Sequence, residues 1–157
     1  MRSSSPKLSV GLISDTHGLL RPEAVGALRG SRYIVHAGDI GDPVVLDELS
    51  RIAPVTAVRG NNDTGPWATK LRETQTLEVG RTRIYVIHDI AQLDLDPAAA
   101  GYQVVVAGHS HRPKNELRDG VLYVNPGSAG PRRFKLPIAV ARLVVSETSV
   151  AFELIGL

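Results

Sequence analysis

The sequence contains no cysteine among its 157 residues. This absence excludes disulfides, thiolate metal sites and cysteine nucleophiles, so any metal site must be built from His, Asp, Glu, Asn and water. The chain also has no apolar run close to the roughly 18 residues of a membrane span. Residues 1–7 are polar and lack the apolar stretch of a signal peptide, so we expect them to form a flexible N-terminus. These absences predict a cytoplasmic protein with no membrane partner.

Excess charge of either sign is also missing. The chain has 18 Lys and Arg against 16 Asp and Glu, which gives a formal net charge of +2, and its basic residues are scattered. This balance does not indicate nucleic-acid binding. The densest basic run is residues 131–135, where Arg132, Arg133 and Lys135 either attract an anionic substrate or form a solvated face.

The length and the hydrophobic content of 43% predict one domain over residues 1–157 with enough apolar side chains for a sizeable core. In the first half, short apolar runs predict strands at residues 8–14, 33–37 and 55–58. Proline-opened helices are predicted between them, at residues 22–28 and 43–52. This alternation is typical of a parallel βαβ arrangement.

The second half shows a pattern of hairpins instead. Gly80-Arg81 and Asp119-Gly120 are turn signals between apolar runs, and two further runs near the C-terminus form another antiparallel pair. The strands predicted in this half cover residues 74–79, 82–88, 104–107, 138–145 and 150–154, and Leu117 and residues 121–124 flank the Asp119-Gly120 turn of a further hairpin.

Nearly every predicted strand in the first two thirds ends in residue types that bind metals. In open α/β sheets, ligands bind beyond the carboxyl ends of the strands, so we expect five separate segments to meet at one edge. These segments are Asp15-Thr16-His17, Gly38-Asp39, Gly60-Asn61-Asn62-Asp63, His88-Asp89 and Gly108-His109-Ser110-His111.

Each segment has a simpler interpretation when it is taken alone. An Asp after a strand often forms a turn or an N-cap, and a lone His88 could cap a strand. A surface pair is a simple account of His109 and His111. Four of the five histidines nevertheless lie at strand ends, and this joint pattern favours a site. The fifth, His36, lies inside an apolar strand, where we expect a buried, hydrogen-bonded structural role.

The ligand types narrow the choice of metal. Imidazole and carboxylate groups without sulfur suit Mn, Fe, Zn, Co or Ni better than Ca or Mg alone. A bridging carboxylate such as Asp39 could hold two ions about 3.5–4 Å apart, the spacing that clamps both oxygens of a phosphoryl transfer.

The ordered set of motifs resembles the calcineurin-like metallophosphoesterase superfamily, and within it the small YfcE-like phosphodiesterases. Gly60-Asn61-Asn62-Asp63 and Asn125-Pro126-Gly127-Ser128 match that subgroup as well, and the resemblance covers about residues 8–145. It implies an α/β (α+β) fold, a two-sheet β-sandwich flanked by helices in four αββα layers, with the metals at one edge.

The resemblance also implies a division of the ligands between two divalent metal ions. One ion would be held by Asp15, His17 and His111. The other would be held by Asn61, His88 and His109, and Asp39 would bridge the two ions. Asp39, Asn61 and His109 would be catalytic. We expect Mn²⁺ first, with Ni²⁺, Fe²⁺, Zn²⁺ or Co²⁺ as alternatives, a small phosphoester substrate, and a homodimer or homotetramer.

The implied reaction is attack on phosphorus by a water or hydroxide held between the ions. Many superfamily members have a histidine directly after the motif asparagine, but here that residue is Asn62, which cannot act as an acid. We therefore expect slow turnover or a preference for good leaving groups, as in aryl phosphodiesters. Asp89 replaces a common glycine, and either contacts a metal-bound water or faces solvent.

A binding module is the alternative to an enzyme. A eukaryotic retromer subunit of similar fold is a protein scaffold with little or no catalysis, and the missing histidine keeps this hypothesis open. The intact set of seven ligand residues argues against it, because a scaffold has no physical need for converging ligands. A nucleotide-binding fold is excluded by the lack of a Gly-x-Gly-x-x-Gly or Walker-type loop.

Overall fold

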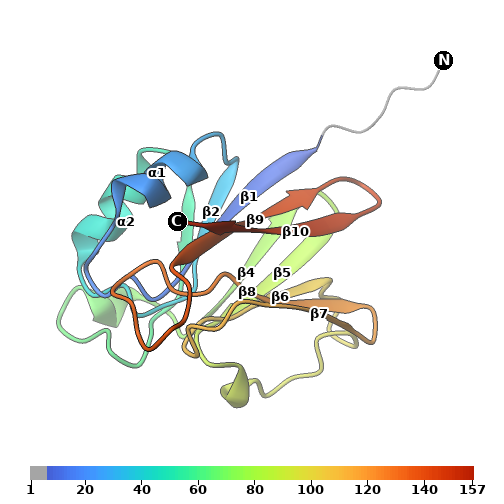
Figure 1. Ribbon diagram of the computed structural model, residues 1–157. Coiled ribbons are helices and arrows are strands. Elements are labelled where there is room, and N and C mark those ends of the chain that lie inside the picture. Colours follow the sequence, from blue (N-terminus) through green and yellow to red (C-terminus); the bar gives the residue numbers. More distant parts are fainter. Residues whose placement is uncertain (1–6) are drawn as a thin grey trace.

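The computed structural model describes residues 7–157, so the predicted flexible N-terminus, residues 1–7, lies outside the described residues except for Lys7. Two five-stranded sheets pack face to face, and two α-helices lie against the outer face of one of them (Figure 1). This arrangement confirms the predicted two-sheet α/β sandwich. None of the helices formed by residues 7–157 has the length and apolar character that crossing a membrane requires.

The first sheet has the strand order β10-β9-β1-β2-β3. Its parallel part consists of β1 (Leu8–Ile13), β2 (Tyr33–His36) and β3 (Val55–Ala57), which are connected by α1 (Pro22–Leu28) and α2 (Pro43–Ser50). The predicted parallel βαβ arrangement is therefore confirmed. The parallel register aligns the ends of these strands, because Ile13 pairs with His36, and His36 pairs with Ala57.

The C-terminal hairpin completes this sheet from the other side. Strands β9 (Ala139–Val145) and β10 (Val150–Gly156) pair antiparallel, as predicted, and β9 also pairs antiparallel with β1. Strand β9 of the C-terminal hairpin therefore lies beside the N-terminal strand β1, with Val145 opposite Leu8. The sequence pattern did not predict this contact, because a strand's hydrophobic alternation does not identify its neighbour.

The second sheet has the order β4-β5-β6-β8-β7. Its edges are the two predicted hairpins, and its centre is parallel, because β6 pairs in parallel with both β5 and β8. The parallel centre was not predicted. The five strands are β4 (Thr74–Val79), β5 (Thr82–Ile87), β6 (Val104–Val106), β7 (Lys114–Arg118) and β8 (Val121–Asn125).

The main core lies between the sheets. Leu12 and Val35 from the first sheet and Val86 and Val106 from the second are fully buried in one apolar cluster. These positions alternate with outward-facing residues, as the two-residue period of a strand requires. Burial of both inner faces fixes the register of every strand, since a slip of one residue would expose the apolar set.

The helical cover of the sandwich is unequal. Leu28 of α1 and Leu49 of α2 are fully buried against the outer face of the first sheet. The outer face of the second sheet is covered by residues 89–103, which contain only the short 3-10 helix η2 (Ile90–Gln92) and pack through side chains such as Tyr102. A second 3-10 helix, η1 (Ala68–Lys70), precedes β4.

Candidate metal centre

Five of the predicted ligand residues have a left-handed backbone, which places their side chains in one region directly after the strands. Residues other than glycine rarely adopt a positive φ, and each costs about 1 kcal/mol or more, so such positions persist only where the surroundings impose them. The five are Asp15 (φ 56°), His17 (φ 47°), Asp39 (φ 54°), His109 (φ 69°) and His111 (φ 63°).

Backbone contacts hold these loops against one another. The N–H of Asp15 donates to the carbonyl of Gly38 at 3.0 Å, and the N–H of His17 donates to the carbonyl of Asp39 at 2.9 Å. Gly60 packs so closely that a Cβ there would lie 2.1 Å from the backbone nitrogen of Asp39. Only glycine fits at residue 60, so the third motif needs it to reach the site.

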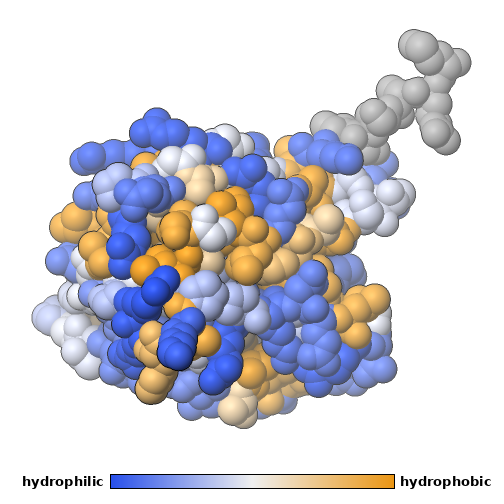
Figure 2. Space-filling view, in the orientation of Figure 1, coloured by the Kyte–Doolittle hydropathy of each residue, from blue (hydrophilic) through white to orange (hydrophobic). Residues whose placement is uncertain are grey.

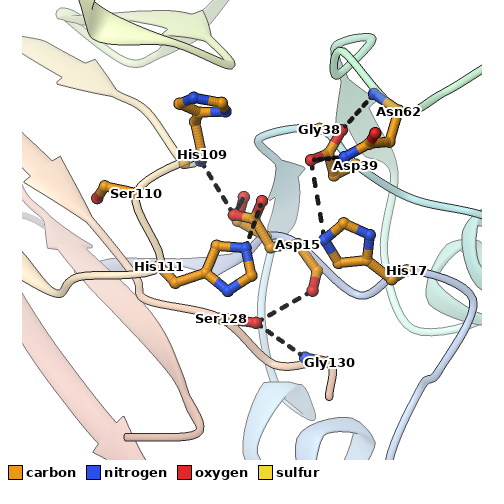
Figure 3. A network of polar contacts seen from close by, with 12 residues as sticks. Asp15, His17, Gly38, Asp39, Asn62, His109, Ser110, His111, Ser128 and Gly130 are labelled. Atoms are coloured by element: carbon orange, nitrogen blue, oxygen red, sulfur yellow. Dashed lines mark hydrogen bonds and ion pairs between the residues drawn. The ribbon is translucent and has the colours of Figure 1, made fainter. Parts of the chain in front are cut away.

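The first group of ligand side chains consists of Asp15, His17 and His111. One ligand atom from each lies within 4.8 Å of the others. The carboxylate of Asp15 faces the imidazole of His111 in Figure 3, and its Oδ1 is 3.4 Å from Nε2 of His111. The Asp15 carboxylate and the His111 imidazole are almost completely buried. This is the trio that the resemblance assigns to one ion.

The second group consists of Asp39, His88 and His109, again with one ligand atom each within 4.8 Å of the others. Asn61 joins them, because its Oδ1 lies 3.0 Å from Nε2 of His88 and 3.2 Å from Nδ1 of His109. His88 donates from Nδ1 to the carbonyl of Ala37 at 2.7 Å, which leaves Nε2 as the ring nitrogen that faces the group.

Asp39 lies between the two groups. Its Oδ2 is 3.8 Å from Nε2 of His17 in the first group and 3.3 Å from Nε2 of His88 in the second. Burial raises the pKa of Asp39, but hydrogen bonds from His88 and from the backbone of Asn62 outweigh it and hold the pKa below its ordinary value. A charged carboxylate in this position fits the predicted bridge. All seven predicted ligand residues thus lie in one region.

Three buried polar atoms of the first group make no hydrogen bond within residues 7–157. They are Oδ1 of Asp15, Nε2 of His17 and Nδ1 of His111. Buried polar atoms are normally satisfied, so unsatisfied oxygen and nitrogen atoms on all three side chains of one group suit a nearby cation. The donor set therefore fits a divalent metal ion that accepts nitrogen and oxygen ligands.

The charges of the remaining site residues depend on that cation. Burial raises the pKa of Asp15, although the hydroxyl of Ser14 donates to its Oδ2 at 2.6 Å. Burial lowers the pKa of His111, which favours the neutral imidazole that metals bind. A bound cation would stabilise the Asp15 carboxylate, since a nearby positive charge favours the ionised form.

His36 has the structural role that the sequence predicts. It is fully buried, its Nε2 lies 3.0 Å from the hydroxyl of Thr16, and its Nδ1 accepts the N–H of Gly38 at 3.1 Å. Because burial disfavours its charged form, the pKa of His36 is lowered to about 3. His36 therefore connects the loop that carries Asp15 and His17 to the loop that carries Asp39.

The role of Asp63, the last residue of the Gly60-Asn61-Asn62-Asp63 motif, is not evident from the sequence. The buried carboxylate of Asp63 accepts three backbone N–H groups, from Ile40 at 3.2 Å, Gly41 at 2.9 Å and Gly60 at 2.9 Å. It thereby joins the loop that carries Asp39 to the loop that carries Asn61. The signal in the sequence that could have indicated this role is the place of Asp63 at the end of the Gly60-Asn61-Asn62-Asp63 motif.

The Asn125-Pro126-Gly127-Ser128 motif also supports the ligand loops. Asn125 donates from Nδ2 to the carbonyl of Gly108 at 3.0 Å. Ser128 donates from its hydroxyl to the carbonyl of Asp15 at 3.1 Å and accepts the N–H of Gly130 (Figure 3). The motif therefore fixes the two loops of the first group rather than supplying ligands.

Asn62 and Asp89, the two departures from the family pattern, both lie at the site. Asn62 donates its backbone N–H to Oδ1 of Asp39 at 2.9 Å and its side-chain amide to Oδ2 at 3.1 Å (Figure 3). Asp89 accepts the N–H of Ala91 at the start of η2, and its side chain is 27% exposed. Asp89 also borders an open hollow of about 440 Å³ beside Asn61 and His88.

This sandwich, with Asp, Asn and His side chains gathered at the strand ends, defines a metallophosphoesterase. The chain belongs to the calcineurin-like phosphoesterase superfamily, whose domain matches residues 8–148. It is 39% identical over 132 residues to a probable metallophosphoesterase of Methanothermobacter thermautotrophicus, covering 76% of each chain. It is 29% identical over 145 residues to the phosphodiesterase YfcE of Escherichia coli, covering 73% of this chain and 76% of YfcE. These matches confirm the resemblance seen in the sequence.

Solved structures share the fold. An archaeal phosphodiesterase superposes with a TM-score of 0.81 at 23% identity, covering 96% of this chain and all of the other (100%). Vps29 of Chaetomium thermophilum superposes with a TM-score of 0.75 at 19% identity, covering 96% of this chain and 97% of the other. At these identities the likeness shows the sandwich fold alone.

Proposed function

We propose that this phosphoesterase is a dinuclear metal-dependent phosphodiesterase. Asp15, His17 and His111 would hold one divalent ion, Asn61, His88 and His109 would hold a second, and Asp39 would be shared between them. The supporting observation is the position of the Asp39 carboxylate, within 4 Å of an imidazole nitrogen of each group. Two divalent ions in such a site supply an activated water and neutralise charge on the phosphate.

The protein side chains bind and orient the substrate. Arg133 is close enough to the first group to contribute to the lowered pKa of His111, so a cation stands beside the place where an anionic phosphate binds. Arg132 and Lys135 flank it in sequence. This favours the interpretation of residues 131–135 as a segment that attracts an anionic substrate.

The site has no assigned acid to protonate the leaving group, and this restricts which phosphate esters it can cleave quickly. The amide of Asn62 is engaged with Asp39, and an amide cannot donate a proton as an acid. Substrates whose leaving group is stable as an anion avoid this requirement. Phosphodiesters with aryl or similar leaving groups are therefore the class that we expect the site to cleave fastest.

The direct test begins with metal analysis of the purified protein. Hydrolysis of a p-nitrophenyl phosphodiester is then measured with Mn²⁺ or Ni²⁺, before and after chelation. We expect metal-dependent hydrolysis that Asp39→Ala and His109→Ala each reduce to near background. Asp96→Asn, an exposed carboxylate in the loop after η2, is the control and should keep full activity. Unchanged hydrolysis in Asp39→Ala and His109→Ala would refute the site.

A protein-binding scaffold is the alternative function, and the fold that the chain shares with Vps29 is compatible with it. The same assay separates the two functions, because a scaffold would bind metal without turnover. Mn²⁺ as the natural metal, a cytoplasmic location and a homodimer or homotetramer remain predictions. One observation supports a homodimer or homotetramer. Hydrophobic residues gather over β9 and β10 in Figure 2, and Leu154 on the edge strand β10 is 45% exposed.

A further inference from the structure

His109 is the ligand histidine that packing holds least. Its side chain is 45% exposed, against 19% for His17 and 5% each for His88 and His111. Its backbone is fixed, because its N–H donates to Oδ2 of Asp15 at 3.1 Å. The ring packs edge-on against the ring of His88, with the ring centroids 5.1 Å apart, and the remaining constraints on its orientation are polar contacts.

Polar groups lie on both sides of the His109 ring. Nδ1 is 3.2 Å from Oδ1 of Asn61, and Nε2 is 3.8 Å from Oδ2 of Asp89. The Asp89 carboxylate is itself held, because its other oxygen accepts the N–H of Ala91 at 3.0 Å. At 3.8 Å the two atoms lie just beyond hydrogen-bond distance, and a small rotation of either partly exposed side chain brings them within it.

His88 shows the same arrangement in completed form. One of its ring nitrogens donates to the carbonyl of Ala37, and the other faces Asn61 and Asp39. An acceptor behind a metal-binding imidazole fixes which nitrogen carries the proton and makes the other a better ligand. Asp89 stands in the corresponding place behind His109.

We propose that Asp89 is a positioning residue for His109. Its carboxylate accepts the Nε2–H of His109, so that Nδ1, which faces Asn61, is unprotonated and would be available to the second metal ion. The inference rests on the proposed dinuclear function and adds to it a residue outside the seven ligands. It also gives η2 a role, because the first turn of η2 orients the carboxylate.

The first test measures metal affinity rather than activity. Thermal unfolding is followed during titration with Mn²⁺ for the wild type, Asp89→Asn and the control Asp96→Asn. Asparagine still caps η2 but carries no charge, so stability without metal should be unchanged. We expect Asp89→Asn to need about 10–100-fold more Mn²⁺ for the same stabilisation, as the loss of such a partner typically requires. Asp96→Asn should match the wild type.

A double-mutant cycle separates positioning from a general effect of charge. In the His109→Ala background, Asp89→Asn should change the Mn²⁺ midpoint no further, because the ring that it orients is gone. An equal loss of affinity in both backgrounds would refute the inference, as would a wild-type midpoint in Asp89→Asn. If Mn²⁺ does not stabilise the wild-type protein at all, both the dinuclear function and the role of Asp89 are refuted.

Discussion

Each of the five ligand residues with a left-handed backbone should carry its own strain, and the free energy of that strain can be measured one residue at a time. At His17, with φ 47°, a Cβ is strained whatever the side chain, so glycine should be better tolerated than alanine. We expect His17→Gly to be more stable than His17→Ala by about 1 kcal/mol in metal-free protein, measured by urea unfolding.

The matched control is Leu117, an exposed residue in the edge strand β7. Glycine in a strand is less stable than alanine by about 0.5–1 kcal/mol, so Leu117→Gly and Leu117→Ala should differ with the opposite sign. The same sign at both positions would show that the backbone of His17 carries no such strain.

His36 gives the residue-scale prediction for pH. Its pKa is lowered to about 3 because burial disfavours the imidazolium, and the charges of His88, Asp39 and His17 act on it as well. Between about pH 6.5 and 3 the unfolded chain binds a proton at this residue and the folded chain does not. Stability from this residue is therefore present above pH 6.5 and lost as the pH falls towards 3.

His36→Gln removes this proton uptake while keeping a polar side chain. We expect the variant to be less stable than the wild type at pH 7, with a smaller loss between pH 6.5 and 4. The measurement is urea unfolding of metal-free protein at a series of pH values. Parallel pH profiles of the two proteins would contradict the assignment.

At the scale of elements, α2 owes its start to local chemistry. Asp42 accepts the N–H of Val44 at 2.9 Å, and Pro43 opens the first turn. We expect Asp42→Ala to destabilise the protein by about 1 kcal/mol in thermal unfolding, and Asp42→Asn by clearly less, since asparagine is an equivalent cap. Equal losses would mean that charge, rather than capping, matters there.

Such local signals explain why most elements could be predicted. The prolines at 22 and 43 mark the observed helix starts, and the two-residue turns at 80–81 and 119–120 mark observed hairpins. The pairing of β6 with β5 and β8 could not be predicted in this way, because a short apolar strand such as Val104–Val106 is compatible with many neighbours.

At the scale of the whole molecule, stability depends on the contact between the sheets. Leu143 of β9 is fully buried in the cluster between them, whereas Leu117 of β7 is 70% exposed. We expect Leu143→Ala to cost about 2–5 kcal/mol of unfolding free energy. Leu117→Ala should stay within about 0.5 kcal/mol, the usual range for a surface substitution. Comparable losses in denaturant unfolding would contradict this account of the core.

The order of the amino acids alone identifies the metal-binding residue types, their places after strands and the family, because each of these is a local pattern or an ordered set of local patterns. It does not identify distances between side chains, since these depend on contacts between loops far apart in the chain, such as the contact of His109 with Asp15, 94 residues away. Folding alone brings Asp39 between the two groups, Asp63 to two ligand loops and Asp89 to His109. These contacts come from parallel pairing and sheet packing, and a linear pattern does not encode such pairing.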